Sequence, residues 1–152
     1  MQCALIVDRT MTKKRTIKTY RDLISLHTFE ERYKFLRLAA KVGDPTFGSF
    51  RWINQNLYNS DEWKRVRNIV IARDNGCDLG IPDRGIFDRI YVHHITPLTL
   101  EDFEENSSLI YDPENLICCS YNTHQAIHYG DESLLIKEFV DRKPNDTCPW
   151  KQ

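Results

Sequence analysis

The chain has 152 residues, of which 41% are apolar and 28% charged, a composition typical of a one-domain globular protein. Its 21 basic and 22 acidic residues give a net charge of −1, which excludes a polycation that coats nucleic acid through bulk charge. Five cysteines without a C-x-x-C pair exclude a cysteine-built zinc ribbon. The apolar run 3–7 is too short for a signal peptide or a membrane span, so we expect a reduced, cytoplasmic protein without membrane contact.

The net charge averages two unlike halves. Residues 1–74 hold 15 Lys/Arg and 8 Asp/Glu, a charge of +7, whereas residues 75–152 hold 6 and 14, a charge of −8. One interpretation is a side that faces a polyanion and a side that gathers cations. The other is mutual attraction between the halves, and the charges alone do not separate the two.

The basic half opens with residues 1–27, which we interpret as a basic N-terminal arm and lead-in. Thr28 and Glu31 then fit a capping box for a helix that starts at Phe29 and should end near Gly43. A short helix is predicted over 50–58.

Ser60 is a suitable N-cap for the most clearly amphipathic helix of this half, which runs up to Asn75-Gly76. Its core-facing positions are Trp63, Val66, Ile69 and Val70. Its basic positions include Lys64, Arg65 and Arg67. These cations are either solvated or follow a phosphate backbone.

The second half has the order strand, loop, strand, helix. Alternation around Ile90 and Val92 predicts a first strand, residues 95–113 are loop-like, and 115–119 suit a second strand. Residues 121–129 suit a helix closed by Gly130, and a last helix is expected over 132–140. Within the second strand, Cys118 and Cys119 are interpreted as small buried residues.

Four of the five histidines fall within this second half. His124 and His128 are four residues apart on the predicted helix, so their side chains point the same way and could share a metal ion. His93 and His94 are successive strand residues that point to opposite faces. One of these two can therefore join the metal while the other addresses a substrate.

Three segments, Val92–Pro97, Asp112–Leu116 and Thr123–His128, together resemble the HNH nuclease motif on a ββα-metal finger. The match covers roughly 89–130 and is most similar to small HNH endonucleases of bacteriophages and prophages. The His-His and His-x-x-x-His pairs are also similar to the nuclease domains of DNase colicins. The resemblance implies an α+β fold in which the finger is embedded in a mainly helical single domain.

The resemblance divides the chain into the arm, 1–27, and one nuclease domain, 28–152. Within that domain it implies a helical part, 28–76, the finger, about 86–130, and a C-terminal helix and tail, 131–152. Many phage HNH proteins also carry two C-x-x-C pairs, whereas here Gly80 stands where Cys77 would have its partner. We therefore expect no structural zinc bound by cysteines.

The resemblance also implies roles for single residues. His94 would be the general base, with His93, His124 and His128 as the metal ligands. Asn115 would pin the loop between the strands and so orient the base, although an Asn after Asp-Pro is also an ordinary turn residue.

Further candidates concern the substrate and the metal. Arg89 is a candidate phosphate clamp, or simply an exposed strand arginine, and Lys64, Arg65 and Arg67 would add phosphate contacts. Three imidazoles favour Zn²⁺, Ni²⁺, Co²⁺ or Mn²⁺ as the bound ion, and Mg²⁺ or Mn²⁺ could still drive the reaction.

The expected activity is metal-dependent hydrolysis of DNA phosphodiesters, as nicks or double-strand breaks, in the host cytoplasm if the gene is phage-borne. Double-stranded DNA is the expected partner. A second copy of the chain, in a homodimer, and a phage packaging protein are further candidate partners. Two alternatives remain: a noncatalytic DNA-binding or assembly module in which the same histidines hold a structural zinc, and an RNase that uses the same finger.

Overall fold

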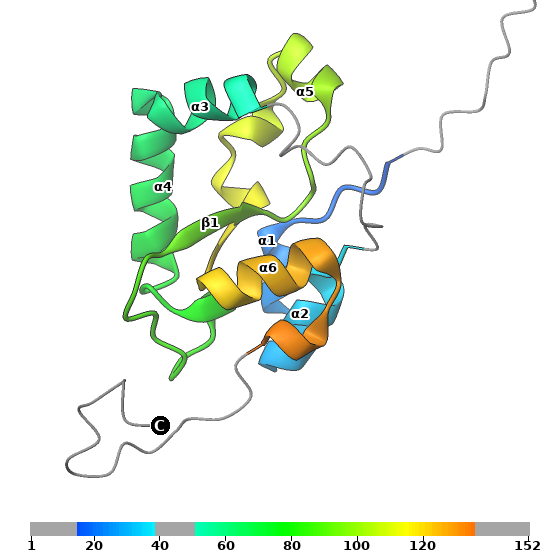
Figure 1. Ribbon diagram of the computed structural model, residues 1–152, viewed down its shortest axis with the longest axis vertical. Coiled ribbons are helices and arrows are strands. Elements are labelled where there is room, and N and C mark those ends of the chain that lie inside the picture. The colour runs from blue at the N-terminus through cyan, green and yellow to red at the C-terminus, as the bar shows by residue number, and fades with distance from the viewer. Residues whose placement is uncertain (1–14, 39–50, 136–152) are drawn as a thin grey trace, which may run out of the picture.

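A computed structural model describes residues 15–38 and 51–135, with side chains from residue 55 onward in the second range. In the described residues, six α-helices lie around one antiparallel hairpin of strands β1, Tyr91–His94, and β2, Leu116–Cys119 (Figure 1). The principal helices are α1 (Tyr20–Ile24), α2 (Phe29–Leu36), α3 (Arg51–Asn59), α4 (Asp61–Arg73) and α6 (Tyr121–Tyr129). The mixed helix and strand content confirms the coarse α+β class.

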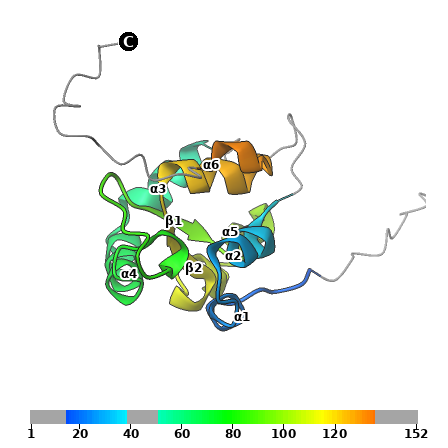
Figure 2. The same ribbon diagram turned by 90° about the horizontal axis from the view of Figure 1, so that it is seen from below.

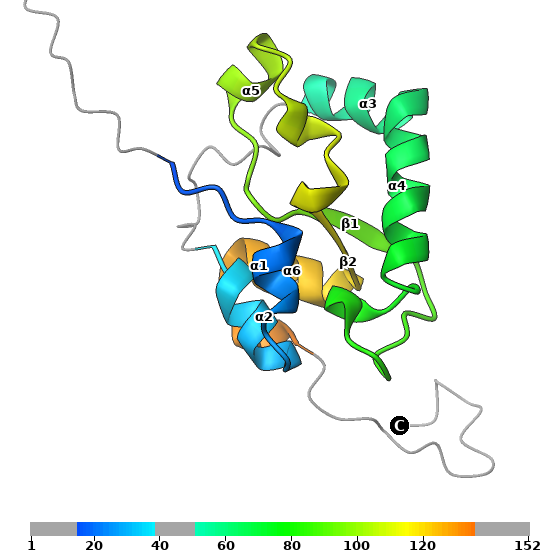
Figure 3. The same cartoon turned by 180° about the vertical axis from the view of Figure 1, so that it is seen from behind.

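The hairpin pairs His93 with Ile117 and His94 with Leu116. Alternate side chains of β2 pack into two different hydrophobic clusters, because successive side chains of a strand point to opposite faces. Ile117 and Cys119 pack with α1, α2 and α6, whereas Leu116 and Cys118 pack with α4. Figures 2 and 3 accordingly show α4 on one side of the hairpin and α1 and α2 on the other.

The helix boundaries follow local caps. Thr28 and Glu31 form the predicted capping box of α2, and Ser60 caps α4 by accepting from the Trp63 N–H at 3.1 Å. Gly130 closes α6 in the left-handed conformation at φ 63°. The predicted helices over 50–58 and 121–129 and both strands are confirmed, with Phe50 outside the described residues.

Helix α2 is shorter than predicted, because it ends at Leu36 and not near Gly43. Arg37 is non-helical at φ −49° and ψ 127°. The next residue, Leu38, donates its N–H to the Ile127 carbonyl of α6 at 3.1 Å. This long-range hydrogen bond takes the chain out of the helical path, and residues 39–50 lie outside the described part.

Three further expectations need correction. The segment 95–113 is not only loop, because Thr99 and Asp102 form a capping box that starts helix α5, Leu100–Glu104. Ile69, predicted to face the core, is 45% exposed. Of the expected helix over 132–140, the described part is a 3-10 turn at Glu132–Leu134 that ends there, because Leu135 is extended at φ −69° and ψ 137°; the residues from 136 lie outside the described part.

The polar lead-in is attached to the rest of the protein along residues 15–24. Arg15 pairs with Asp102 at 2.7 Å, and the Lys18 N–H donates to the Thr96 hydroxyl at 2.8 Å. Leu23 of α1 is fully buried in the core beside α2. Residues 15–24 thus hold the long connection between β1 and β2, while the division of the chain at residue 27 stays a prediction.

Cys118 and Cys119 are fully buried, which confirms their interpretation as small core residues. Burial raises the pKa of the Cys118 thiol to about 12 and raises that of Cys119 as well, so both thiols stay protonated at neutral pH. Among the described residues, no helix combines the length and the apolar character needed to cross a lipid bilayer.

Candidate metal centre

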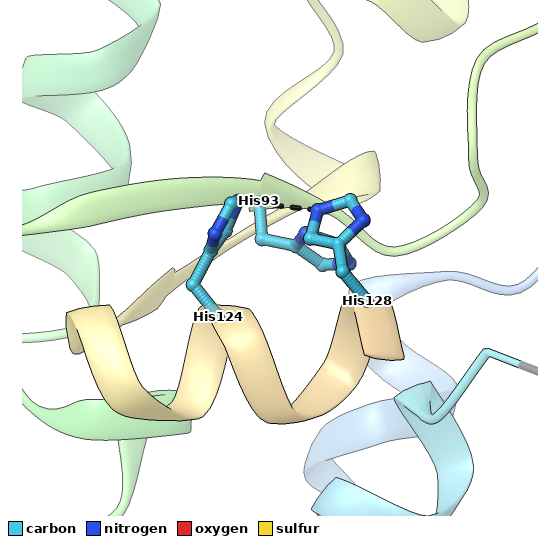
Figure 4. Close-up of side chains that lie close together, drawn as sticks. All are labelled: His93, His124 and His128. Carbon is cyan, nitrogen blue, oxygen red and sulfur yellow. Dashed lines mark hydrogen bonds between the residues drawn. The ribbon is translucent and has the colours of Figure 1, made fainter. Parts of the chain in front are cut away.

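Three histidines converge between β1 and α6 (Figure 4). His93 comes from the strand, and His124 and His128 come from successive turns of the helix. One ring nitrogen from each lies within 4.8 Å of the other two, which is close enough for all three to bind one metal ion. The structure thus brings together the three predicted metal ligands.

Helix α6 is fixed at its N-terminus by a buried carboxylate. Asp78 accepts hydrogen bonds from the Ser120 N–H at 3.1 Å, the Ser120 hydroxyl at 2.9 Å and the Thr123 hydroxyl at 2.6 Å. Because Thr123 is anchored in this way, the position of His124, the next residue of the helix, is fixed as well. No local sequence pattern marks Asp78 as a site residue, because its partners lie more than 40 residues away along the chain.

The cluster holds its imidazoles in the neutral form that a metal requires. Burial lowers the pKa of His124 to about 4, and burial also lowers the pKa values of His93 and His128. The Nε2 atoms of His124 and His128 lie 3.2 Å apart, so one ring donates a proton to the lone pair of the other.

One buried nitrogen in the cluster lacks a partner. His93 Nε2 is the buried side-chain polar atom that makes no hydrogen bond within the described residues. An orphaned buried polar group costs about 1–3 kcal/mol, and a bound cation would relieve this cost. The donor set, three neutral imidazoles of which one has an unpaired ring nitrogen, therefore fits a divalent transition metal better than Mg²⁺.

The neutral cluster makes the metal-free protein sensitive to acid. Histidines in the unfolded chain have a pKa of about 6.5, whereas burial lowers the pKa of the three cluster histidines and of His94 in the fold. Below about pH 6.5 the unfolded chain thus binds more protons, and the free energy of unfolding falls by about 1.4 kcal/mol per pH unit for each proton taken up. Urea titrations in EDTA between pH 7 and 5 should show an uptake of two or more protons on unfolding. A free energy of unfolding that stays constant or increases as the pH is lowered from 7 to 5 would contradict the neutral state of these histidines.

His94 points to the opposite face of β1, as its position in the strand predicts. Its ring stacks on Trp63 of α4 with centroids 5.5 Å apart, and only 8% of the residue is exposed. The Nε2 atom lies 3.0 Å from the Ile110 carbonyl, which can only accept, so Nε2 carries the proton and Nδ1 keeps its lone pair. Burial lowers the pKa of His94 to about 4, and the imidazole is therefore neutral at pH 7.

Asn115 is buried and ties down the connection between the strands. Its Oδ1 accepts from the Thr96 N–H at 2.7 Å, and its Nδ2 donates to the Thr96 carbonyl at 3.2 Å and to the Leu109 carbonyl at 3.0 Å. Leu109 precedes Ile110, whose carbonyl holds His94. Sequence reasoning missed Trp63 and Ile110 as neighbours of His94, because a core aromatic and a backbone carbonyl leave no motif.

The predicted basic contacts separate into two groups. Arg89 is exposed and lies over the Tyr91 ring at 5.4 Å, and Tyr91 in turn lies 5.2 Å from His124. The residues Lys64, Arg65 and Arg67 lie on α4, across the hairpin from the three metal ligands. Lys64 pairs with Asp61 at 3.3 Å and Arg67 donates to the Ile90 carbonyl at 3.1 Å, while Arg65 is exposed.

Comparisons of the chain with protein-family models, with curated proteins and with solved structures find no match.

Proposed function

We propose that the protein is a metal-dependent HNH endonuclease that hydrolyses DNA phosphodiester bonds, and that β1, β2 and α6 form its ββα-metal finger. The observation that carries this proposal is the arrangement of the adjacent residues His93 and His94. The first joins two helix histidines in a cluster able to bind a metal, and the second faces away from it in a neutral, hydrogen-bonded state. The proposal includes a phage or prophage origin, which only the sequence resemblance supports.

His93, His124 and His128 would hold one divalent ion, with Zn²⁺, Mn²⁺, Ni²⁺, Co²⁺ or Mg²⁺ as candidates. A bound ion supplies electrostatic stabilisation of the charge that develops on the phosphate and on the leaving oxygen. Three protein ligands leave open positions, which is the property that separates a catalytic site from a closed, four-coordinate structural one.

His94 is assigned the role of general base. Its Nδ1 lone pair can accept a proton from the attacking water, because Nε2 already donates to the Ile110 carbonyl. Asn115 is assigned a positioning role, since it holds Thr96 and Leu109 and so fixes the segment that carries this carbonyl. The stacking on Trp63 restricts the rotation of the His94 ring.

Four positively charged side chains are assigned contacts with the DNA phosphates. Arg89 would clamp a phosphate near the histidine cluster, because it extends from the segment before β1 and reaches Tyr91, a neighbour of His124. Lys64, Arg65 and Arg67 would contact the backbone farther along the DNA. Binding through such contacts is expected to weaken steeply as salt is added.

Relaxation of supercoiled plasmid tests the proposed function. We expect the purified protein to nick plasmid DNA with Mn²⁺ or Mg²⁺ and to stop when EDTA is added. No cleavage with any divalent metal, together with unfolding on chelation, would instead favour a noncatalytic module with a structural zinc. Preferential digestion of RNA in a parallel reaction would favour the RNase alternative.

A further inference from the structure

Three tyrosines, Tyr91, Tyr121 and Tyr129, form a surface beside the histidine cluster that we call the tyrosine face. Tyr121 and Tyr129 are the first and last residues of α6, and they are 53% and 61% exposed. Between them, Gln125 donates its amide to the Tyr121 hydroxyl at 2.9 Å. Exposed rings grouped in this way indicate an interaction surface more often than scattered ones do.

The tyrosine face is continuous with the candidate metal centre. The Tyr91 ring lies 5.8 Å from the Tyr121 ring and 5.2 Å from the imidazole of His124. At the outer edge, the Arg89 guanidinium lies 5.4 Å from the centre of the Tyr91 ring. A ligand bound on these rings would therefore lie next to the metal ligands and within reach of a positive charge.

A shallow pocket of about 290 Å³ lies on this face of α6. Its lining consists of two aromatic rings, two side-chain amides and one aliphatic side chain, from Tyr121, Tyr129, Asn122, Gln125 and Leu134. The described lining holds no carboxylate that would repel a phosphate backbone. Flat apolar rings together with amide donors and acceptors match the face and the edge of a nucleobase.

We propose that the tyrosine face binds single-stranded DNA by stacking unpaired bases beside the metal site, an inference that rests on the proposed nuclease function and specifies its substrate. Every base has an apolar face, so stacking on tyrosine binds single strands without sequence preference. Bases paired inside a duplex cannot present this face. The surface thus selects DNA whose strands are separated near the bond to be cut.

Fluorescence anisotropy with a labelled oligothymidylate tests this proposal, with EDTA present so that no cleavage occurs. Tyr121→Ala and Tyr129→Ala should each weaken binding by about fivefold or more, which corresponds to the loss of one stacked base. Tyr121→Phe is the matched control, because it keeps the ring and removes only the hydroxyl. Its affinity for the oligothymidylate should stay within about twofold of wild type. Binding of a blunt DNA duplex should change little in all three variants.

The outcomes separate this inference from the proposed function. Wild-type protein that does not bind the oligothymidylate, or alanine variants that bind it normally, would overturn the stacking proposal even if plasmid is nicked. An equal loss of single-strand and duplex binding would also overturn it. If the alanine variants lose oligothymidylate affinity as expected but the wild-type protein cleaves no DNA with any metal, the result would support this binding site and contradict the nuclease function.

Discussion

Replacing His94 with alanine is expected to lower the rate of plasmid nicking by about 10²–10⁴-fold, the range that one positioned general base contributes. The neutral ring presents the Nδ1 lone pair while Nε2 donates to Ile110, and alanine offers no proton acceptor at this position. The three metal ligands are unchanged, so metal binding should persist. Rates of supercoil loss with Mn²⁺ measure the effect.

The substitution also removes a ring that stacks on Trp63 and leaves the Ile110 carbonyl without its donor. His94→Asn is therefore a necessary companion, because an amide can still donate a hydrogen bond. Both variants should show this loss of nicking rate of about 10²–10⁴-fold, with far-ultraviolet circular dichroism like that of wild type. His27→Ala is the matched control, since His27 is exposed and outside the cluster, and it should cleave normally. Wild-type rates in the folded His94 variants would contradict the assignment of the base.

Replacing His128 with alanine is expected to weaken metal binding by more than about 10–100-fold. A loss of that size is typical when a residue that only hydrogen-bonds to a metal ligand is removed, and here a ligand itself is removed. His128 contributes one of the three nitrogens that lie within 4.8 Å of one another, and its loss leaves a two-histidine site. Because a metal that binds only the folded state stabilises it, a hundredfold loss of affinity at saturating metal corresponds to about 2.7 kcal/mol of stability.

Calorimetric titration with Zn²⁺ measures the affinity, and urea titration with and without the metal measures the stability. Wild type should bind one ion per chain, and His27→Ala should behave like wild type in both experiments. Equal Zn²⁺ affinity in wild type and His128→Ala would show that the three histidines do not form the metal site.

The elements that the sequence predicts well depend on nearby residues. The Thr28–Glu31 capping box, the Ser60 cap and the Gly130 terminus are formed by side chains within a few positions of the helix end. The same pattern, Thr followed three residues later by Asp, also marks α1 at Thr19 and α5 at Thr99. The sequence therefore carries a local signal for these two short helices as well.

The features that were not predictable depend on contacts between distant segments. The pairing of Arg15 with Asp102 joins residues 87 positions apart, and the early end of α2 depends on a hydrogen bond from Leu38 to α6. In the candidate site, helical spacing alone puts His124 beside His128. The approach of His93, in contrast, requires α6 to pack against β1, which Asp78 supports from another segment.

The most direct test of the central claim is a plasmid nicking assay that compares wild type, His94→Ala and His128→Ala at equal concentration with Mn²⁺. We expect nicking by wild type that EDTA abolishes, and loss of nicking in both variants, with metal binding retained in His94→Ala and weakened in His128→Ala. Nicking by both folded variants at the wild-type rate would contradict this claim.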